Sequence, residues 1–288
     1  RRRAGKKTRS RARRSKRLDA FGPGARGTLL TRRRLDAELV RRKLAPSRGA
    51  AQRAIGEGWV EVEGLPAAKP ATLVDADASV RIVAEPDRFV GRGGLKLDAA
   101  LDAFGIDVSG RTAIDVGAST GGFTDCLLQR GAASVVALDV GYGQLDWGIR
   151  RRSEVVVVER TNFRHADLAA LGAPFDVVVA DLSFISLGTV APQFAAAGAA
   201  GTDYVLLVKP QFEVGKGQVG KGGIVRDPAL HSSALIAVAE SLEAVGLGAR
   251  GVVPSPVTGA KGNREFLLWV QLGAPTLDAE QIDGVVKR

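Results

Sequence analysis

The sequence predicts an α/β protein of two domains, a small basic α+β domain followed by a larger domain of alternating strands and helices. Strand-like and helix-like segments alternate from Phe89 onward, which is the pattern of a sheet covered by helices. Between Leu29 and Val83, by contrast, two helix-like segments precede three short strand-like runs. The change of pattern indicates a domain boundary between these regions.

These patterns divide the chain into a basic tail and linker (1–28), a small domain (29–87), a linker (88–91), a large domain (92–274) and a C-terminal tail (275–288). Residues 1–17 hold eleven Lys or Arg and no acid, whereas the rest of the chain is close to neutral. Such a segment cannot repay its ordering entropy by burying apolar surface, so we expect it to be disordered. A solvated leader and a nucleic-acid-binding arm both remain open for it.

The composition is that of a globular chain, with 45% hydrophobic and 25% charged residues among 288. No apolar run reaches the ~18–20 residues that cross a bilayer, and none resembles a signal peptide. Cys126 is the only cysteine and is expected in the core, so a disulfide framework is excluded and a cytoplasmic location is predicted. We expect no metal, because His165 and His231 are isolated. Since the sequence holds no methionine, we expect Arg1 not to be the native first residue.

The small domain opens with helical spacing. Apolar residues from Leu35 to Leu44 recur at intervals of one turn, and Ser47 is placed to cap a second helix through Ile55. Strand-like runs follow, with glycine and proline turn residues between them, at 59–62, 72–74 and 80–83.

The two predicted helices carry a large excess of basic residues, since residues 26–53 contain only Asp36 and Glu38 as acids. The cations expected on one surface are Arg32, Arg33, Arg34, Arg41, Arg42, Lys43, Arg48 and Arg53. Phosphate backbones are the natural partner of such a surface. A solvated helical face is the alternative, and the near absence of compensating acids argues against it.

This region resembles the S4 RNA-binding motif. The resemblance rests on Arg34-Leu35-Asp36, Leu39-Val40, Ser47-Arg48-Gly49-Ala50-Ala51, Gly58-Trp59-Val60-Glu61-Val62 and Lys69-Pro70. It implies that the helices and small sheet hold structured RNA. One departure is Gly64-Leu65 where the motif usually has Asn-Gly, so we expect a differently built turn there.

In the large domain, short apolar runs bounded by turn residues predict seven buried strands. They are residues 112–116, 134–138, 154–158, 175–180, 204–208, 251–253 and 265–271, with helices notably at 124–130, 187–200 and 228–245.

A glycine-rich turn follows the first of these strands, in Asp115-Val116-Gly117-Ala118-Ser119-Thr120-Gly121-Gly122-Phe123. Glycine lets the backbone turn tightly and approach a ligand where Rossmann-like sheets bind nucleotides. The spacing fits neither dinucleotide turns nor phosphate-binding loops, and a plain strand-to-helix turn is the alternative. Asp139, after the second strand, is placed to take both hydroxyls of an adenosine ribose, and Asn162, after the third, to meet an adenine edge.

Together these features resemble S-adenosylmethionine-dependent methyltransferases of the FtsJ type, whose catalytic domain is of the Rossmann-like class I. The resemblance implies S-adenosyl-L-methionine as cofactor, with Asp115 holding the turn or the methionyl ammonium group. The residues expected to bind it are Asp115, Gly117, Ser119, Thr120, Gly121, Gly122, Asp139, Asn162 and Asp181.

Four charged residues stand at the ends of separate elements: Lys96, Asp181, Lys209 and Glu265. They resemble the Lys-Asp-Lys-Glu tetrad of RNA ribose 2′-O-methyltransferases. A ribose hydroxyl is a weak nucleophile that must be aligned and relieved of its proton. We therefore expect Lys209 to be the base, Asp181 to steer its amine near the methyl group, and Lys96 and Glu265 to position the hydroxyl and balance charge.

The arrangement over roughly residues 29–272 is similar to the hemolysin A (TlyA) family of ribosomal RNA methyltransferases. Further matching stretches are residues 139–145, 220–228 and 255–256. The resemblance implies 2′-O-methylation of cytidines in small-subunit ribosomal RNA, with large-subunit RNA left open, and an effect on susceptibility to ribosome-targeting cyclic peptide antibiotics. Ribosomal RNA or ribosomal subunits are then the expected partners. Phe89 stands in the linker where related proteins often have Trp, which leaves open whether this linker affects cofactor binding.

Three other functions remain open. An RNA-binding or ribosome-assembly protein without catalysis would not need the intact Asp139 and the four tetrad residues. A membrane-lytic protein would need a spanning segment or a long amphipathic helix. Methylation of another RNA, such as a transfer RNA, would use the same residues.

Overall fold

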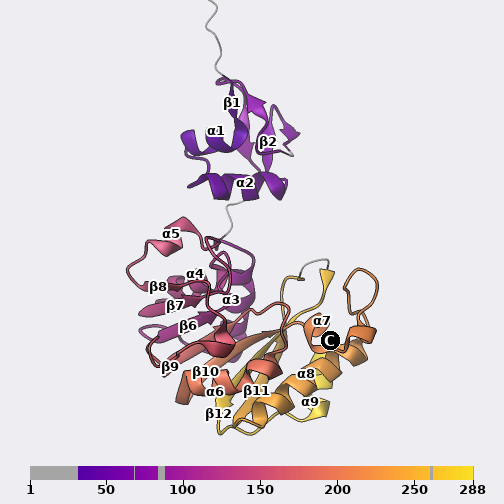
Figure 1. Ribbon diagram of the computed structural model, residues 1–288. Helices are drawn as coiled ribbons and strands as arrows, with labels where there is room; N and C mark the ends of the chain where they lie inside the picture. The colour runs from indigo at the N-terminus through magenta and orange to yellow at the C-terminus, as the bar shows by residue number, and fades with distance from the viewer. Residues whose placement is uncertain (1–31, 68, 84–87, 260–261, 288) are drawn as a thin grey trace, which may run out of the picture. The chain divides into compact units, whose positions relative to one another are not determined.

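The computed structural model describes residues 32–83 apart from 68, residues 88–259 and residues 262–287. The tail at 1–28 that we expect to be disordered lies outside these residues. The chain forms two compact units, divided between Arg81 and Ile82 (Figure 1).

In the first unit, two short helices pack on each other, and Leu35, Leu39 and Ile55 are buried in its core. β1 pairs antiparallel with β4, and β2 lies between β3 and β5 in a second sheet. The elements are β1 (Arg33–Arg34), α1 (Leu35–Arg41), α2 (Arg48–Gly56), β2 (Val60–Val62), β3 (Leu65–Pro66), β4 (Leu73–Val74) and β5 (Val80–Ile82).

Local chemistry explains the ends of these elements. Ser47 caps α2 as predicted, because its Oγ accepts a hydrogen bond of 3.2 Å from the Ala50 amide. α1 ends at Arg41, earlier than the pattern through Leu44 predicts, because Lys43 takes a left-handed φ of 60°. The turn between β2 and β3 has φ values of 52° at Glu63 and 77° at Gly64. Two positive values make it a type I′ hairpin turn, with Glu63 in the position that Asn favours.

The second unit is built on a seven-stranded sheet in the order β11-β12-β10-β9-β6-β7-β8. The five strands from β10 to β8 are parallel, and β12 runs antiparallel to both β10 and β11. The strands are β6 (Thr112–Val116), β7 (Ser134–Leu138), β8 (Val155–Val158), β9 (Phe175–Ala180), β10 (Gly198–Val208), β11 (Leu247–Pro254) and β12 (Phe266–Leu272).

Helices cover both faces of this sheet (Figure 1). On one face α6, α8 and α9 enclose a core that includes Phe194 and Leu235; on the other, α3 and α4 enclose Leu97 and Leu127. The helices are α3 (Gly93–Phe104), α4 (Gly122–Gln129), α5 (Trp147–Arg150), α6 (Ala191–Ala197), α7 (Pro210–Glu213), α8 (Pro228–Glu243) and α9 (Ala279–Val286), with 3₁₀ turns η1 (Phe163–His165), η2 (Leu187–Val190) and η3 (Lys216–Gln218).

Two segments differ from the prediction. The helix expected at 187–200 is a 3₁₀ turn followed by α6, which ends at Ala197 because β10 already begins at Gly198. Residues 275–288, expected as a tail, contain α9, whose Ile282 is buried and which packs on α8. A reciprocal capping box between Asp278 and Gln281 begins this helix.

The expected linker at 88–91 packs on the second unit. Phe89 is buried at 2% exposure, and the Val90 amide donates a 2.8 Å hydrogen bond to the Asp125 carboxylate on α4. Gln129 donates to the Arg88 carbonyl. Residues 84–87 lie outside the described residues.

Candidate functional site

A pocket of about 510 Å³ opens at the carboxyl ends of β6, β7, β8 and β9. The chain runs from β6 outward to β8 and then returns to β9 on the other side of β6. This reversal makes the switch point at which open α/β sheets bind ligands. The pocket is lined by Gly117, Ser119, Leu138, Asp139, Val140, Gln144, Thr161, Asn162, Phe163, Asp181, Leu182, Ser183, Phe184, Ile185 and Val190.

The glycine-rich turn is packed tightly against the end of β9. Gly117 has a φ of 89°, and a Cβ there would lie 2.7 Å from the Asp181 carbonyl oxygen. Gly121 has a φ of 96° and is the N-cap residue of α4. Both positions therefore need glycine for backbone conformation, and Gly117 needs it for space as well.

Of the residues expected to hold a cofactor, the structure brings Gly117, Ser119, Asp139, Asn162 and Asp181 to the pocket wall. Asp115, Thr120, Gly121 and Gly122 are not in that wall and instead build the turn behind it.

Asp139 is oriented by backbone amides. Its Oδ2 accepts from the Ser119 amide at 2.8 Å and its Oδ1 from the Gly141 amide at 2.6 Å. A carboxylate has about four acceptor positions, so two remain for a ligand. The side-chain Oδ1 of Asn162 accepts a 3.0 Å hydrogen bond from the Arg164 amide and so caps η1, which commits part of the side chain that we expect to meet adenine.

Asp115 is completely buried behind the turn. Its Oδ2 accepts a 2.6 Å hydrogen bond from Thr124, and its Oδ1 has no partner among the described residues. Burial, with a smaller contribution from the negative charges of Asp181 and Asp139, raises the pKa of Asp115 to about 7. A buried carboxyl group without full compensation is costly, and such groups concentrate at functional sites.

The four tetrad residues form two ion pairs. Lys209 Nζ lies 2.5 Å from Asp181 Oδ1, and Lys96 Nζ lies 2.5 Å from Glu265 Oε2. Lys96, Lys209 and Glu265 are each less than 10% exposed.

Strand order brings these pairs to one edge. Asp181 follows β9, Lys209 follows the neighbouring β10, and Glu265 precedes β12, whose Phe266 pairs with Val208. Adjacent strands lie about 4.8 Å apart, so the three residues form a short row beside the pocket. Lys96 reaches this row from the first turn of α3.

Sequence reasoning missed several residues of this site. Ser183 accepts a 2.8 Å hydrogen bond from Lys209 Nζ, and it belongs to the motif Asp181-Leu182-Ser183-Phe184, which could have indicated it. Phe184 is 90% exposed, and its ring lies 5.1 Å from that of Phe212. The apolar pocket residues carry no signal in a single sequence, because they look like ordinary core residues.

In the first unit, Asp36 holds one group of the predicted basic residues. Its buried carboxylate accepts two hydrogen bonds from Arg34 at 3.1 and 2.9 Å, one from Arg48 at 3.1 Å and one from Gln52 at 3.0 Å. The hydrogen bonds from Arg34, with further ones from Gln52 and Arg48, hold the pKa of Asp36 well below its usual range despite burial.

Glu38 holds a second group. Arg41 donates to it at 2.8 and 2.6 Å and Arg42 at 2.7 Å, while Arg33 lies 4.0 Å away. The hydrogen bonds from Arg41, together with those from Arg42, lower the pKa of Glu38 to about 2, although burial opposes them. Arg42 also donates to the Ala78 carbonyl, so it braces the fold.

Asp36 and Glu38 thus each interact with several arginines, so they compensate more of the positive charge than one ion pair per acid would. The side chains of Arg33, Arg34, Arg41 and Arg48 nevertheless stay between 46% and 58% exposed. Each of these side chains is held by an acid and stays partly exposed to solvent, so the direction in which its guanidinium group points is fixed. Arg32 pairs with Asp75.

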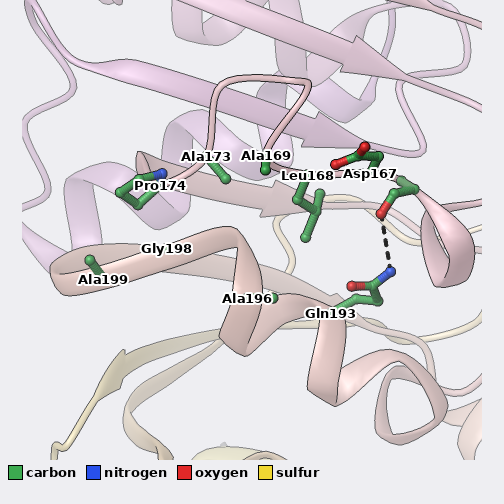
Figure 2. Close-up of a pocket in the computed structure, with 10 residues that line it drawn as sticks. Asp167, Leu168, Ala169, Ala173, Pro174, Gln193, Ala196, Gly198 and Ala199 are labelled. Carbon is green, nitrogen blue, oxygen red and sulfur yellow. Dashed lines mark hydrogen bonds between the residues drawn. The ribbon is translucent and has the colours of Figure 1, made fainter.

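A second hollow, of about 460 Å³, lies at the opposite edge of the sheet, where β9 and β10 begin (Figure 2). Half of its ten lining residues are alanine, and its polar side chains are Asp167 and Gln193. The Gln193 amide is committed to backbone carbonyls, including that of Ala166. None of the four tetrad residues is among those that line this hollow.

The described part of the chain contains neither a candidate membrane span nor a candidate metal cluster. No helix there combines the length and apolar character needed to cross a membrane. No group of three or more His, Cys, Asp or Glu in the same residues is arranged to hold a metal ion. Cys126 is buried, and burial raises its pKa to about 12, which suits a core residue and not a nucleophile.

Comparison with known proteins agrees with both units. A family model described as FtsJ-like methyltransferase matches residues 89–272, and one described as S4 domain matches residues 33–80. The 16S/23S rRNA (cytidine-2′-O)-methyltransferase TlyA of Mycobacterium tuberculosis is 51% identical over 259 residues, which are 89% of this chain and 97% of that protein. Hemolysin A of Brachyspira hyodysenteriae is 37% identical over 235 residues, covering 81% of this chain and 98% of that protein.

A solved structure of a presumed hemolysin from Streptococcus thermophilus has a TM-score of 0.70 at 37% identity, covering 90% of this chain and 95% of that one. The two family resemblances and the α/β fold predicted from the sequence are therefore confirmed. The chain belongs to the hemolysin A (TlyA) family, with an S4 domain ahead of an FtsJ-like methyltransferase domain.

Proposed function

We propose that this protein methylates the ribose 2′-oxygen of cytidines in ribosomal RNA and takes the methyl group from S-adenosyl-L-methionine. One observation carries the proposal: the Lys209–Asp181 and Lys96–Glu265 ion pairs stand at the sheet edge beside the 510 Å³ pocket. The relative from Mycobacterium tuberculosis carries this activity in its name and aligns with 89% of this chain.

The pocket fits the proposed cofactor. Asp139 has free acceptor positions for the two ribose hydroxyls, and Leu138 and Phe163 offer apolar surface to a base. Asp115 is completely buried and lies outside the pocket wall, so in this proposal it supports the turn from behind through its hydrogen bond with Thr124. When bound, the cofactor supplies a methyl group on a positively charged sulfur.

Lys209 is the proposed base. To act as a base, Lys209 must first give up one proton of its ion pair with Asp181; the neutral amine then has two N–H groups and one lone pair. Asp181 Oδ1 at 2.5 Å and Ser183 Oγ at 2.8 Å can take the two N–H groups, which leaves the lone pair for the proton of the ribose hydroxyl. Lys209 Nζ would accept the proton that the ribose hydroxyl gives up when its oxygen is methylated; the cofactor would supply the methyl group and keep the electron pair of the broken carbon–sulfur bond.

The Lys96–Glu265 pair completes the charge balance. Both side chains are buried, so each would be costly without the other. In this proposal Glu265 orients the hydroxyl, and Lys96, which is ion-paired with Glu265, holds and neutralises it.

The S4 domain supplies RNA affinity in this proposal. The arginines anchored by Asp36 and Glu38 offer guanidinium groups in fixed directions to phosphate oxygens. Ribosomal RNA or a ribosomal subunit is the partner, and a cytoplasmic location follows from that substrate.

An RNA-binding protein without catalysis is the second candidate. It would explain the arginine surface, but it gives no reason for the two buried ion pairs beside the pocket.

The test is methyl transfer from tritium-labelled S-adenosylmethionine to purified small and large ribosomal subunits, followed by nucleoside analysis. We expect label in 2′-O-methylcytidine from at least one subunit. Cofactor binding without transfer to either subunit would redirect the proposal to another RNA. Absence of cofactor binding would favour the binding protein.

A further inference from the structure

The loop ahead of β12 makes an unusually close approach to the catalytic carboxylate. The Glu265 carboxylate is 4% exposed, and its Oε2 bonds to Lys96. A Cβ placed on Gly259 would overlap Glu265 Oε1 and Cδ and would lie 3.1 Å from Oε2. The backbone of residue 259 therefore bounds one side of the space that the Glu265 carboxylate occupies.

Backbone conformation does not explain why residue 259 is a glycine. Its φ lies outside the left-handed region, so an alanine could adopt the same backbone without strain. The three atoms nearest to the added Cβ all belong to Glu265. Space for the Glu265 carboxylate is thus the specific reason for glycine at 259.

Asn263 fastens the same loop. Its carbonyl accepts a 2.9 Å hydrogen bond from the Gly259 amide. Its side chain, in a residue only 3% exposed, accepts from the Val225 amide at 3.0 Å and donates to the Gly223 carbonyl at 2.9 Å. Asn263, which accepts from the Gly259 amide, is thereby tied to the segment 223–225, and Gly220 and Ile224 close that segment by a hydrogen bond.

We propose that Gly259 and Asn263 are positioning residues for the catalytic pair: Asn263 fixes the position of Gly259, and the bare backbone of Gly259 holds the Glu265 carboxylate against Lys96. Neither residue was indicated by sequence patterning. The inference rests on the proposed function for its catalytic consequence, but the geometric coupling between positions 259 and 265 is independent of it.

The experiment is a double-mutant cycle of Gly259→Ala and Glu265→Ala in the full chain, with Gly284→Ala as matched control. Gly284 lies in α9, and an added Cβ there meets nothing within 4 Å. Methyl transfer to ribosomal subunits, cofactor binding by calorimetry and unfolding in urea are measured for each variant.

We expect Gly259→Ala to lower kcat about 10- to 100-fold, because misplacing a reacting group by about 1 Å has effects of that size. Cofactor affinity should stay within about twofold of wild type, since neither residue lines the cofactor pocket. With Glu265→Ala present, adding Gly259→Ala should change neither kcat nor the urea midpoint further, because the overlap no longer exists. Asn263→Ala should lower kcat with the same lack of additivity.

Effects that multiply in the double variant would overturn the proposal, as would a Gly259→Ala enzyme with wild-type kcat. If the wild type transfers no methyl group, the proposed function fails, and the urea midpoints still decide the coupling. If Gly259→Ala lowers the urea midpoint of the wild type but not that of the Glu265→Ala variant, the coupling between positions 259 and 265 is supported. If it lowers both midpoints equally, the coupling is refuted.

Discussion

Replacement of Lys209 tests the proposed chemistry most directly. Its amine is held by Asp181 and Ser183 and is the one lysine amine beside Asp181 in the described structure. General bases contribute about 10²- to 10⁴-fold to rate, and each factor of ten corresponds to about 1.4 kcal/mol of activation free energy. Lys209→Ala should therefore raise the barrier by about 3–5 kcal/mol.

The structure also predicts what this change leaves intact. Lys209 does not line the cofactor pocket, whereas Asp181 does. Without its lysine partner, the Asp181 carboxylate is free to face the cationic sulfur, so cofactor affinity should not fall. Lys209→Arg separates two roles for the side chain, because a guanidinium keeps the charge but does not give up a proton to act as a base.

The assay is single-turnover transfer of labelled methyl to ribosomal subunits at saturating cofactor, with calorimetry for cofactor binding. Lys287→Ala is the matched control, since that side chain is 70% exposed. Turnover of Lys209→Ala within about threefold of wild type would refute Lys209 as base. Substantial activity in Lys209→Arg, with Lys209→Ala inactive, would assign the lysine an electrostatic role instead.

Three further predictions concern the pocket and the S4 domain. Burial raises the pKa of Asp115 to about 7, so the folded protein keeps a proton that the unfolded chain releases near pH 4. Binding this proton favours the folded state. Its contribution to the free energy of unfolding is complete below about pH 4 and is lost as pH rises to about 7. Asp115→Asn should remove that decline, on the order of 4 kcal/mol, and an unchanged urea-unfolding profile from pH 4 to 7 would contradict it. Gly117→Ala should weaken cofactor binding more than tenfold by calorimetry, because its Cβ would lie 2.7 Å from the Asp181 carbonyl oxygen; unaltered affinity would show that the turn adapts. Arg48→Ala should lower the salt dependence of RNA binding by about one unit of slope, and the same slope as wild type would mean that Arg48 meets no phosphate.

Much of the site's position follows from local patterns in the sequence. Apolar runs ending in Asp139, Asp181 and Lys209 predict strand ends, and the carboxyl ends of parallel strands meet at one edge. The glycine-rich turn after β6 is equally local, because glycine permits a φ such as the 89° of Gly117. These residues could be placed together without coordinates.

The S4 surface was only partly predictable. The excess of arginine is visible in the sequence, but the acid that each arginine pairs with is not. The buried Asp36 is held by Arg34, which precedes α1, and by Arg48, which begins α2. Which cations an acid holds depends on the packing of α1 on α2, and composition carries no information about that.

The sequence by itself determined the α/β architecture and the glycine-rich turn, because these depend on periodicity and on residue type at element ends. The four charged residues were identified by their positions at element ends together with their resemblance to a known tetrad. Only the tertiary structure decided how those residues are paired. Lys96 and Glu265 are 169 positions apart, and the glycine that shapes the carboxylate's position has an ordinary backbone conformation. Such contacts arise from side-chain direction and close packing between distant segments, which leave no periodic trace along the chain.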